Sequence, residues 1–556
     1  MYVTASGGHI GAGAANAAIN LASGLGACGS LPASVVVNEF TTAAAAYAFS
    51  GFAPAAGSGA VAFQGKSPGL DQAFLTLTNL VAPSTGAFAT RTFVTNQTAV
   101  QQLLDTVADA MAACDASSRA AACAQLFACA AANASFVSTG QPCTGGTSTA
   151  ATDTLNAALA ITQNAGLVSQ NTSGGVDGIF DLAGANSAFL PILAAAPNDY
   201  SLPLIFTTVS VNRGPLAVDA SGHAWLLSKD PNPPSPPPAI APLSVIELDA
   251  DGSLISPSLH GWTAGGVSNI QSNDITNLAI DTTGNVWVGG TGSTIAELTS
   301  SGAGAPNAPF SAGTGPDDTT GVTIDTAGNA WFASGNTNPT VFEMSPTGSN
   351  LSTSAGFTAG NCPCNGIAAD PSGNVWVASS GASQFLAEIS PAGVQGSIFA
   401  PPGHATATFY QVASDAAGSL WITDQHDHAV WEFTPSSPTF PSTGTWGGPF
   451  GNVAAPQTYP KGIAIDGAGH KWVANQPQTL GVSASLTEFS ADGSVNLSPG
   501  NGLGWGTLGG AYSVAIDGSG NVWVSDGGNH VILFVGLGAP TRNPIATAVS
   551  SGSFAP

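Results

Sequence analysis

The amino-acid sequence predicts a mainly β chain, a seven-bladed β-propeller preceded by a small α-helical domain. A motif of Asp, two residues, Gly, two residues and Trp occurs seven times, starting 62, 44, 45, 45, 51 and 51 residues apart. Such a period is typical of propeller blades. Seven of the eleven tryptophans occupy the last position of this motif. The seven copies begin at Asp219, Asp281, Asp325, Asp370, Asp415, Asp466 and Asp517.

Residues 1–197 carry no copy of the motif and are rich in Ala, so we expect a separate α-helical domain there. The apolar spacing predicts helices over 14–27 and 34–49, one or two helices over 98–132, and a helix over 154–166 with Asp153 as its N-cap. Five of the seven cysteines precede residue 150, and we expect disulfides among them. The sequence leaves their pairing open, and the odd number leaves at least one thiol over.

Residues 198–556 form the predicted propeller. In each blade one strand precedes the motif's Asp, Gly supplies a positive φ in the turn, and a second strand packs its Trp between neighbouring blades. A third strand ends in Glu and an apolar residue in six copies, and a poorly marked outer strand follows. The seventh copy lacks the Glu and the outer strand. Because an open ring would expose two sheet edges, we predict that residues 202–211 supply the missing strand.

Charge and hydropathy exclude several classes of partner. Eight Lys and Arg face 32 Asp and Glu, a formal net charge of −24, which disfavours nucleic acid and anionic lipid. No stretch of about 18 apolar residues is present, so we expect no membrane insertion. The composition favours an extracellular or cell-surface monomer, with a cytoplasmic protein as the alternative. No basic residue precedes Lys66, so no export signal is visible, and we expect the natural N-terminus to have been lost.

The repeat resembles the NHL-repeat and streptogramin (virginiamycin B) lyase-like propellers. Segments such as Gly462-Ile463-Ala464-Ile465-Asp466 carry this resemblance, as do the two turns at 423–428 and 525–530. The chain also resembles bacterial surface propellers with an Ala-rich helical segment in front. The resemblance implies the fold, but this fold hosts lyases, lactonases, amidating enzymes and binding proteins alike.

The resemblance places the strand before each Asp innermost, so the residue five positions before that Asp should face the mouth of the central channel. These residues are Gly214, Thr276, Thr320, Asn365, Tyr410, Lys461 and Tyr512. Gluconolactonase-like propellers hold a metal at such positions through Asn and Asp, and Asn365 matches the Asn. The other six supply no carboxylate, although Asp274, Asp317 and Asp318 lie close in sequence. We therefore expect no cofactor, with Ca or Mg as the alternative.

A lyase-like mechanism would need a His base and a carboxylate near the channel. His404, His426 and His428 are the candidates, and His426 and His428 share a turn with Asp424 and Asp427. Imidazole and carboxylate together could bind a transition metal. We favour a structural role in the turn, because a similar pattern recurs at Asp526 and His530.

Two functions from different classes remain. The first is a secreted or cell-surface module that binds or scaffolds a protein, peptide or glycan through the channel mouth, at Thr276, Thr320, Asn365, Tyr410, Lys461 and Tyr512. The second is a metal-assisted lyase or lactonase at the same mouth. The six repeated Glu are expected to pack or protect strand edges. Because the predicted mouth is mostly Thr, Tyr and Gly, we favour the binding module.

Overall fold

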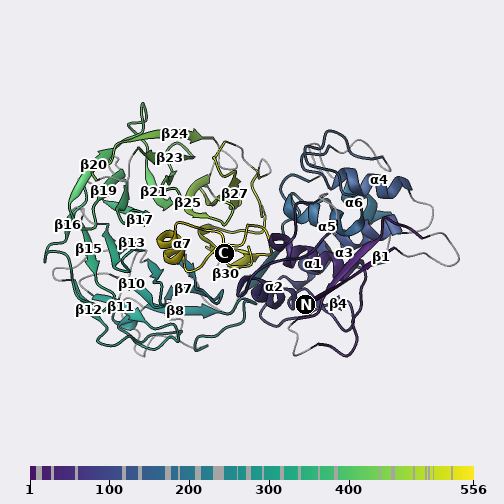
Figure 1. The fold of residues 1–556 in the computed structure, drawn as a ribbon, viewed down its shortest axis with the longest axis horizontal. Coiled ribbons are helices and arrows are strands. Elements are labelled where there is room, and N and C mark those ends of the chain that lie inside the picture. Colours follow the sequence, from purple (N-terminus) through teal and green to yellow (C-terminus); the bar gives the residue numbers. More distant parts are fainter. Residues whose placement is uncertain are drawn as a thin grey trace.

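The structure, a computed structural model, joins a helical unit to a ring of small sheets that surrounds a short C-terminal helix (Figure 1). The residues it describes are 1–7, 15–26, 31–56, 60–115, 120–135, 141–168, 177–185, 188–206, 214–229, 243–258, 261–270, 277–290, 294–312, 319–335, 340–360, 363–380, 386–436, 440–451, 458–479, 482–494, 497–498, 501–504, 506–527 and 530–556. Among the predicted positions, Cys28, Thr276, Asp274, Asp317, Asp318, Cys362 and residues 207–211 lie outside these ranges.

The helical unit contains six helices, one 3₁₀ turn and two small hairpins within the described residues. Its elements are β1 (Tyr2–Ser6), β2 (Asn20–Gly24), α1 (Glu39–Ala48), η1 (Ser50–Phe52), α2 (Gly69–Leu77), β3 (Val81–Ala82), β4 (Ala87–Phe88), α3 (Gln97–Asp115), α4 (Ala120–Cys129), α5 (Thr154–Gln163) and α6 (Gly178–Gly184). Helix α1 is buried from Phe40 to Ala48, so its alanines allow the neighbouring elements to approach closely on all sides.

The predicted helices over 98–132 and 154–166 are present as α3, α4 and α5, and Asp153 caps α5 through the backbone N–H of Asn156 at 2.9 Å. The helix expected over 34–49 begins only at Glu39, because Asn38 and Thr41 form a capping box there. The helix predicted over 14–27 is wrong. Residues 20–24 form strand β2 instead, paired antiparallel with β1, so a tertiary partner overrides the helical preference of alanine.

Two disulfides join elements of this unit. Cys114 at the end of α3 pairs with Cys123 in α4, and Cys129 at the end of α4 pairs with Cys143. The first bridge fastens the two helices together, as expected for this part of the chain. The fifth N-terminal cysteine, Cys28, lies outside the described residues, and Cys364 is buried in the ring.

The ring contains seven antiparallel sheets, so the predicted seven-bladed propeller is confirmed. Blades one to three are β6 (Leu216–Val218), β7 (Ala224–Lys229) and β8 (Leu243–Leu248); β9 (Leu278–Ile280), β10 (Val286–Gly289), β11 (Thr294–Leu298) and β12 (Phe310–Ser311); and β13 (Thr319–Ile324), β14 (Ala330–Ser334), β15 (Thr340–Met344) and β16 (Phe357–Thr358). Blades four and five are β17 (Cys364–Ala369), β18 (Val375–Ser379), β19 (Leu386–Ile389) and β20 (Gln395–Phe399); and β21 (Phe409–Ser414), β22 (Leu420–Asp424), β23 (Ala429–Pro435) and β24 (Gly444–Phe450). Blades six and seven are β25 (Thr458–Ile465), β26 (Lys471–Pro477) and β27 (Ser485–Phe489); and β28 (Ala511–Ile516), β29 (Val522–Asp526), β30 (His530–Phe534) and β5 (Pro203–Phe206). A 3₁₀ turn, η2 (Val267–Asn269), follows blade one.

Each Asp of the motif organises its own turn and holds its own Trp. In blade two, one oxygen of Asp281 accepts the backbone N–H groups of Thr283 and Asn285, and the other accepts the indole N–H of Trp287 at 3.1 Å. Gly284 between them has φ +90°, a conformation that favours Gly. All seven indoles bond in this way and all seven are buried, each in a cluster with the next blade's side chains.

Strand β5 lies far earlier in the sequence than the rest of blade seven, yet it pairs antiparallel with β30. It belongs to the 202–211 segment that the sequence analysis expected to close the ring. Its outer edge is also occupied, because Asn96 accepts the N–H of Ile205 at 2.9 Å and donates to the carbonyl of Pro203 at 2.8 Å. The helical unit thereby covers an edge that would otherwise be free to pair with another chain.

The helical unit and blades one and seven share a single buried core. In that core Leu533 lies opposite Trp523 in the β29–β30 ladder, the position that Glu297 holds opposite Trp287 in blade two. The missing seventh Glu thus has a tertiary cause, since the apolar Leu533 packs in the core that blade seven shares with the helical unit.

Candidate functional site

The channel through the ring contains a cavity of about 260 Å³. Its walls come from the innermost strand of every blade. Two positions before each motif Asp, a small side chain lines the cavity, and most of these side chains are only partly buried. They are Ala217, Ala279, Thr323, Ala368, Ala413, Ala464 and Ala515. Because six of the seven are alanines, the centre of the ring stays hollow.

The C-terminal segment closes the channel at the Asp-turn end. Helix α7 (Ile545–Ser551) lies inside the ring in projection (Figure 1). Its residues Ala546 and Val549 line the cavity. Phe554 packs in the core of blade six with Ile463 and Ile465. The chain leading to α7 is tied to turn residues, since the N–H of Ala539 donates to Asp466 at 3.0 Å. The predicted mouth residues lie at the opposite end of the channel, where the inner strands begin.

Two of the predicted mouth residues form hydrogen bonds between neighbouring blades of the ring. Thr320 donates its hydroxyl to the carbonyl of Cys364 at 2.6 Å, and Asn365 donates its amide to the carbonyl of Phe409 at 2.8 Å. Each bond runs from one blade to the next. Both residues line the cavity, but their donor groups brace neighbouring blades.

The other three described mouth residues gather into one cluster, which we call the Tyr–Lys cluster (Tyr410, Lys461 and Tyr512). The two phenols hydrogen-bond to each other from blades five and seven. The ammonium of Lys461, from the intervening blade six, lies 4.0 Å from the ring centroid of Tyr410 and 5.7 Å from that of Tyr512. Burial raises the pKa of Tyr410 to about 12, so its hydroxyl stays protonated.

The blade-five turn places its histidines beside the same mouth, because Asp424 in that turn pairs with Phe409 at the start of the inner strand. Asp427 bonds two imidazoles there, His404 at 2.6 Å and His426 at 2.8 Å. Burial opposes ionisation of Asp427, but the hydrogen bonds from the two histidines hold its pKa below its usual range. A single carboxylate thus orients both rings.

The remaining turn candidates have structural roles. Asp424 is buried and accepts the indole N–H of Trp431 at 3.1 Å and the backbone N–H of Thr408 at 2.7 Å. His428 bonds the carbonyl of Thr458 at 2.7 Å and adopts φ +49°, a left-handed turn conformation. Both therefore secure the turn.

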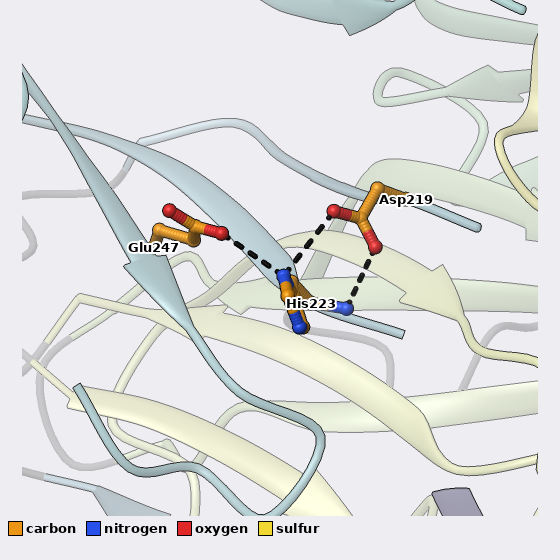
Figure 2. Close-up of side chains that lie close together, drawn as sticks. All are labelled: Asp219, His223 and Glu247. Carbon is orange, nitrogen blue, oxygen red and sulfur yellow. Dashed lines mark hydrogen bonds and ion pairs between the residues drawn. The ribbon is translucent and has the colours of Figure 1, made fainter. Parts of the chain in front are cut away.

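A second cluster, which the sequence analysis did not single out, joins Asp219, His223 and Glu247 in blade one (Figure 2). His223 Nδ1 lies 2.9 Å from Glu247 and 3.4 Å from Asp219, and the hydrogen bond to Glu247 raises the pKa of the imidazole. Of the described residues, these alone bring three potential metal ligands so close together. The sequence feature that could have revealed this cluster is the residue four positions after each motif Asp, which is His223 in blade one.

That cluster belongs to the repeat. In blade two the equivalent Asn285 donates to Glu297 at 2.8 Å, and in blade three Asn329 donates to Glu343 at 2.8 Å. In blade six His470 bonds Glu488 at 2.9 Å. Asn or His can occupy this position and make the same hydrogen bond to the Glu. The cluster is therefore a structural contact between the turn and the third strand of the blade. Of the two roles expected of the Glu residues, packing and edge protection, the structure supports packing, because Glu297 and Glu343 are buried inside their blades.

No protein-family model and no curated protein matches the chain. Solved structures match its ring. A virginiamycin B lyase from Staphylococcus aureus is 14% identical over 60% of this chain and 98% of its own, with a TM-score of 0.44. The surface component PorZ of the Porphyromonas gingivalis type-IX secretion system is 16% identical over 62% and 48%, with a TM-score of 0.42. YCF48, solved with a D1 peptide, is 15% identical over 62% and 97%, with a TM-score of 0.38.

These proteins are similar to the chain in architecture, and none of their activities is transferred to it. The NHL-repeat and surface-protein resemblances stay predictions. Within the described residues, no helix combines the length and the apolar character needed to span a membrane.

Proposed function

We propose that this chain is an extracellular binding module that holds a segment of a protein, peptide or glycan at the mouth where the inner strands begin. The observation that carries the proposal is the Tyr–Lys cluster. Thr320 and Asn365 brace the ring at their positions, whereas Tyr410, Lys461 and Tyr512 place two phenols and an ammonium at one sector of the mouth.

The chemistry of this sector suits recognition. Tyrosine offers a large amphipathic surface and loses little side-chain entropy on binding. His426 lies in the adjacent turn, and His404 lies in the segment between β20 and β21 and shares Asp427 with it. The two side chains are 51% and 35% exposed and offer further hydrogen-bonding groups. Together these residues extend the mouth outward over blade five.

An extracellular location agrees with the two disulfides, because such bonds persist in oxidising compartments. The formal charge of −24 disfavours polyanionic partners such as nucleic acid. We therefore propose neutral or weakly charged polymer segments as partners and a monomeric module.

The competing function is a metal-assisted lyase or lactonase. It would require several oxygen or nitrogen ligands to converge beside a base. Of the described candidates, Asp424 and Asn365 are used in structural hydrogen bonds, and His404 and His426 both bond the single carboxylate of Asp427. This arrangement favours binding over metal-assisted chemistry.

The experiment screens the purified chain on a random-peptide display library and a glycan array. We expect a set of binders that Tyr410→Ala weakens by more than tenfold. His470→Asn is the matched control, because Asn occupies the same repeat position in blades two and three.

Two outcomes contradict the proposal. One is that binders are unaffected by Tyr410→Ala. The other is that the chain linearises a streptogramin B or opens a lactone in the presence of Mg²⁺, detected by mass spectrometry, and that His404→Ala abolishes this turnover.

A further inference from the structure

We infer that the channel binds an apolar group bearing a carboxylate, with the apolar part among the ring of alanines and the carboxylate at Lys461. The inference rests on the proposed function, because Tyr410 and Tyr512 of the mouth also line the cavity, which would receive the end of a ligand held there. It assigns a chemistry to that ligand.

The interior of the channel is suited to an apolar group. Alanine methyl groups from six blades form its walls, and Ala546, Val549 and Phe554 from the C-terminal segment close its base. Polar side chains such as Asn365 and Thr323 also line the cavity. The amide of Asn365 donates to the carbonyl of Phe409 at 2.8 Å, and the hydroxyl oxygen of Thr323 accepts the N–H of Ala369 at 3.2 Å. An apolar ligand inside the channel therefore leaves these two polar groups with their partners.

The size of the cavity limits the apolar part. A protein cavity of about 150 Å³ lined by aliphatic residues holds one benzene molecule, and this cavity measures about 260 Å³. It therefore admits a single phenyl ring or a short alkyl chain. A larger hydrophobic body would displace α7 from the base of the channel.

The positive charge of Lys461 indicates which polar group the ligand carries. Only eight Lys and Arg occur in the whole chain, and among the described side chains Lys461 is the one whose ammonium lies over the two tyrosines that line the cavity. An ammonium beside a cavity whose lining is mostly, but not wholly, apolar attracts a carboxylate more strongly than it would in water. The two phenol rings already face a cation, so a cationic ligand would meet repulsion at this point.

A carboxylate on a small apolar group has two sources. It can be a free carboxylic acid, or it can be the C-terminus of a peptide that ends in an apolar residue. Both present the same two groups to the channel, and the experiment separates them by what is attached beyond the carboxylate-bearing residue.

The probes are hexanoate, hexan-1-ol and hexylamine, titrated into the full chain by isothermal titration calorimetry with ligand-observed NMR. We expect hexanoate to bind about tenfold or more tightly than hexan-1-ol, as a charge-assisted contact predicts, and hexylamine to bind least. Lys461→Met keeps the aliphatic stem and should reduce hexanoate to the level of the alcohol. Lys66→Met removes the same charge from an exposed position of the helical unit and should change nothing.

A second variant tests the location independently of charge. Ala413→Leu enlarges a wall residue and should weaken hexanoate and hexan-1-ol together. Thermal denaturation verifies that the variant is folded, and Ala464→Leu provides a second wall position should the first variant unfold.

The source is decided with N-acetylated tripeptides ending in Phe, one with a free C-terminus and one amidated. Tighter binding of the free-acid peptide than of hexanoate assigns the site to peptide termini, and the reverse assigns it to small acids. Equal binding of acid and alcohol by the wild-type chain, or an unchanged preference in Lys461→Met, overturns the inference.

If the proposed function is wrong, the experiments give a different set of results. In that case the library and the array yield no partner sensitive to Tyr410→Ala, while hexanoate still binds in a Lys461-dependent manner. If only the inference fails, partners are found at the mouth but Ala413→Leu leaves their affinity unchanged.

Discussion

The side-chain amide of Asn521 donates to the hydroxyl of Thr76 at 3.0 Å, joining the seventh blade to helix α2 across 445 positions of sequence. Both residues are buried. In blades two and three the equivalent asparagines bond a Glu of their own blade. In blade seven the helical unit replaces that Glu, so the two units share polar as well as apolar contacts.

This contact predicts coupling between the units. Thr76→Val removes one acceptor of the Asn521 amide, which also lies within hydrogen-bond distance of Asp517 and Ser519, and we expect the free energy of unfolding to fall by about 0.5–1.5 kcal/mol. A double-mutant cycle with Asn521→Ala, measured by urea denaturation, should give a coupling energy of more than about 0.5 kcal/mol. The same cycle between Thr76→Val and Asn374→Ala, the blade-four equivalent, should give none.

The hydrogen bond from each indole to its Asp predicts that replacing the Trp lowers the unfolding free energy by more than the lost packing alone. Trp376→Phe removes the donor 2.8 Å from the buried Asp370, and we expect a loss of about 3 kcal/mol in unfolding free energy. Trp446→Phe, on the partly exposed outer strand β24, is the matched control and should cost less than about 1 kcal/mol. Similar losses for both variants in chemical denaturation would show that the buried bond contributes little.

Stability should fall as the pH rises from 5 to 8. Burial and the nearby Asp281 raise the pKa of Glu297 to about 7, and burial and Asp325 raise that of Glu343 to about 7, from 4.5 in an exposed side chain. Their folded states hold protons that the unfolded chain has released. Their stabilisation is complete below pH 4.5 and is lost as the pH passes through 7.

We therefore expect a higher melting temperature at pH 5 than at pH 8, measured by calorimetry in matched buffers. Glu297→Gln with Glu343→Gln should flatten this dependence, because the amides keep the contacts with Asn285 and Asn329. Glu432→Gln removes one charge from a half-buried site and serves as the control. An unchanged pH profile in the double variant would refute the assignment.

The C-terminal segment that closes the channel should contribute to the stability of the ring. Phe554 is 5% exposed in the core of blade six, and Phe554→Ala should lower the unfolding free energy by about 3 kcal/mol or more. Leu351→Ala, at a side chain that is 48% exposed, should change it by less than about 0.5 kcal/mol. Equal, small effects in denaturant titrations would mean that the C-terminal segment is only loosely held.

Reduction should destabilise the helical unit. The bridges Cys114–Cys123 and Cys129–Cys143 close short loops, and each should contribute about 2–4 kcal/mol. A reductant should lower the melting temperature of the wild-type chain in calorimetry. A variant with all four cysteines replaced by Ser should melt at the reduced temperature with or without reductant, and an insensitive wild type would argue against both bonds.

The sequence alone determined the propeller and its seven blades, because the Asp, Gly and Trp of each copy act within one turn and one pair of strands. Local chemistry of that kind is visible as a repeat. The capped helix after Asp153 was predictable for the same reason. Strand β2 was not, since its alanines favour a helix until β1 pairs with them.

Only the tertiary structure decided how the predicted mouth residues are arranged. Asn365 matched a family pattern, yet its amide donates to the next blade, while Tyr410, Lys461 and Tyr512 meet from three different blades. The C-terminal segment at the base of the channel and the presence of Leu533 in place of the seventh Glu both depend on contacts between distant segments. Such contacts leave no periodic trace in the chain, because each occurs once and its partners are brought together only when the ring closes.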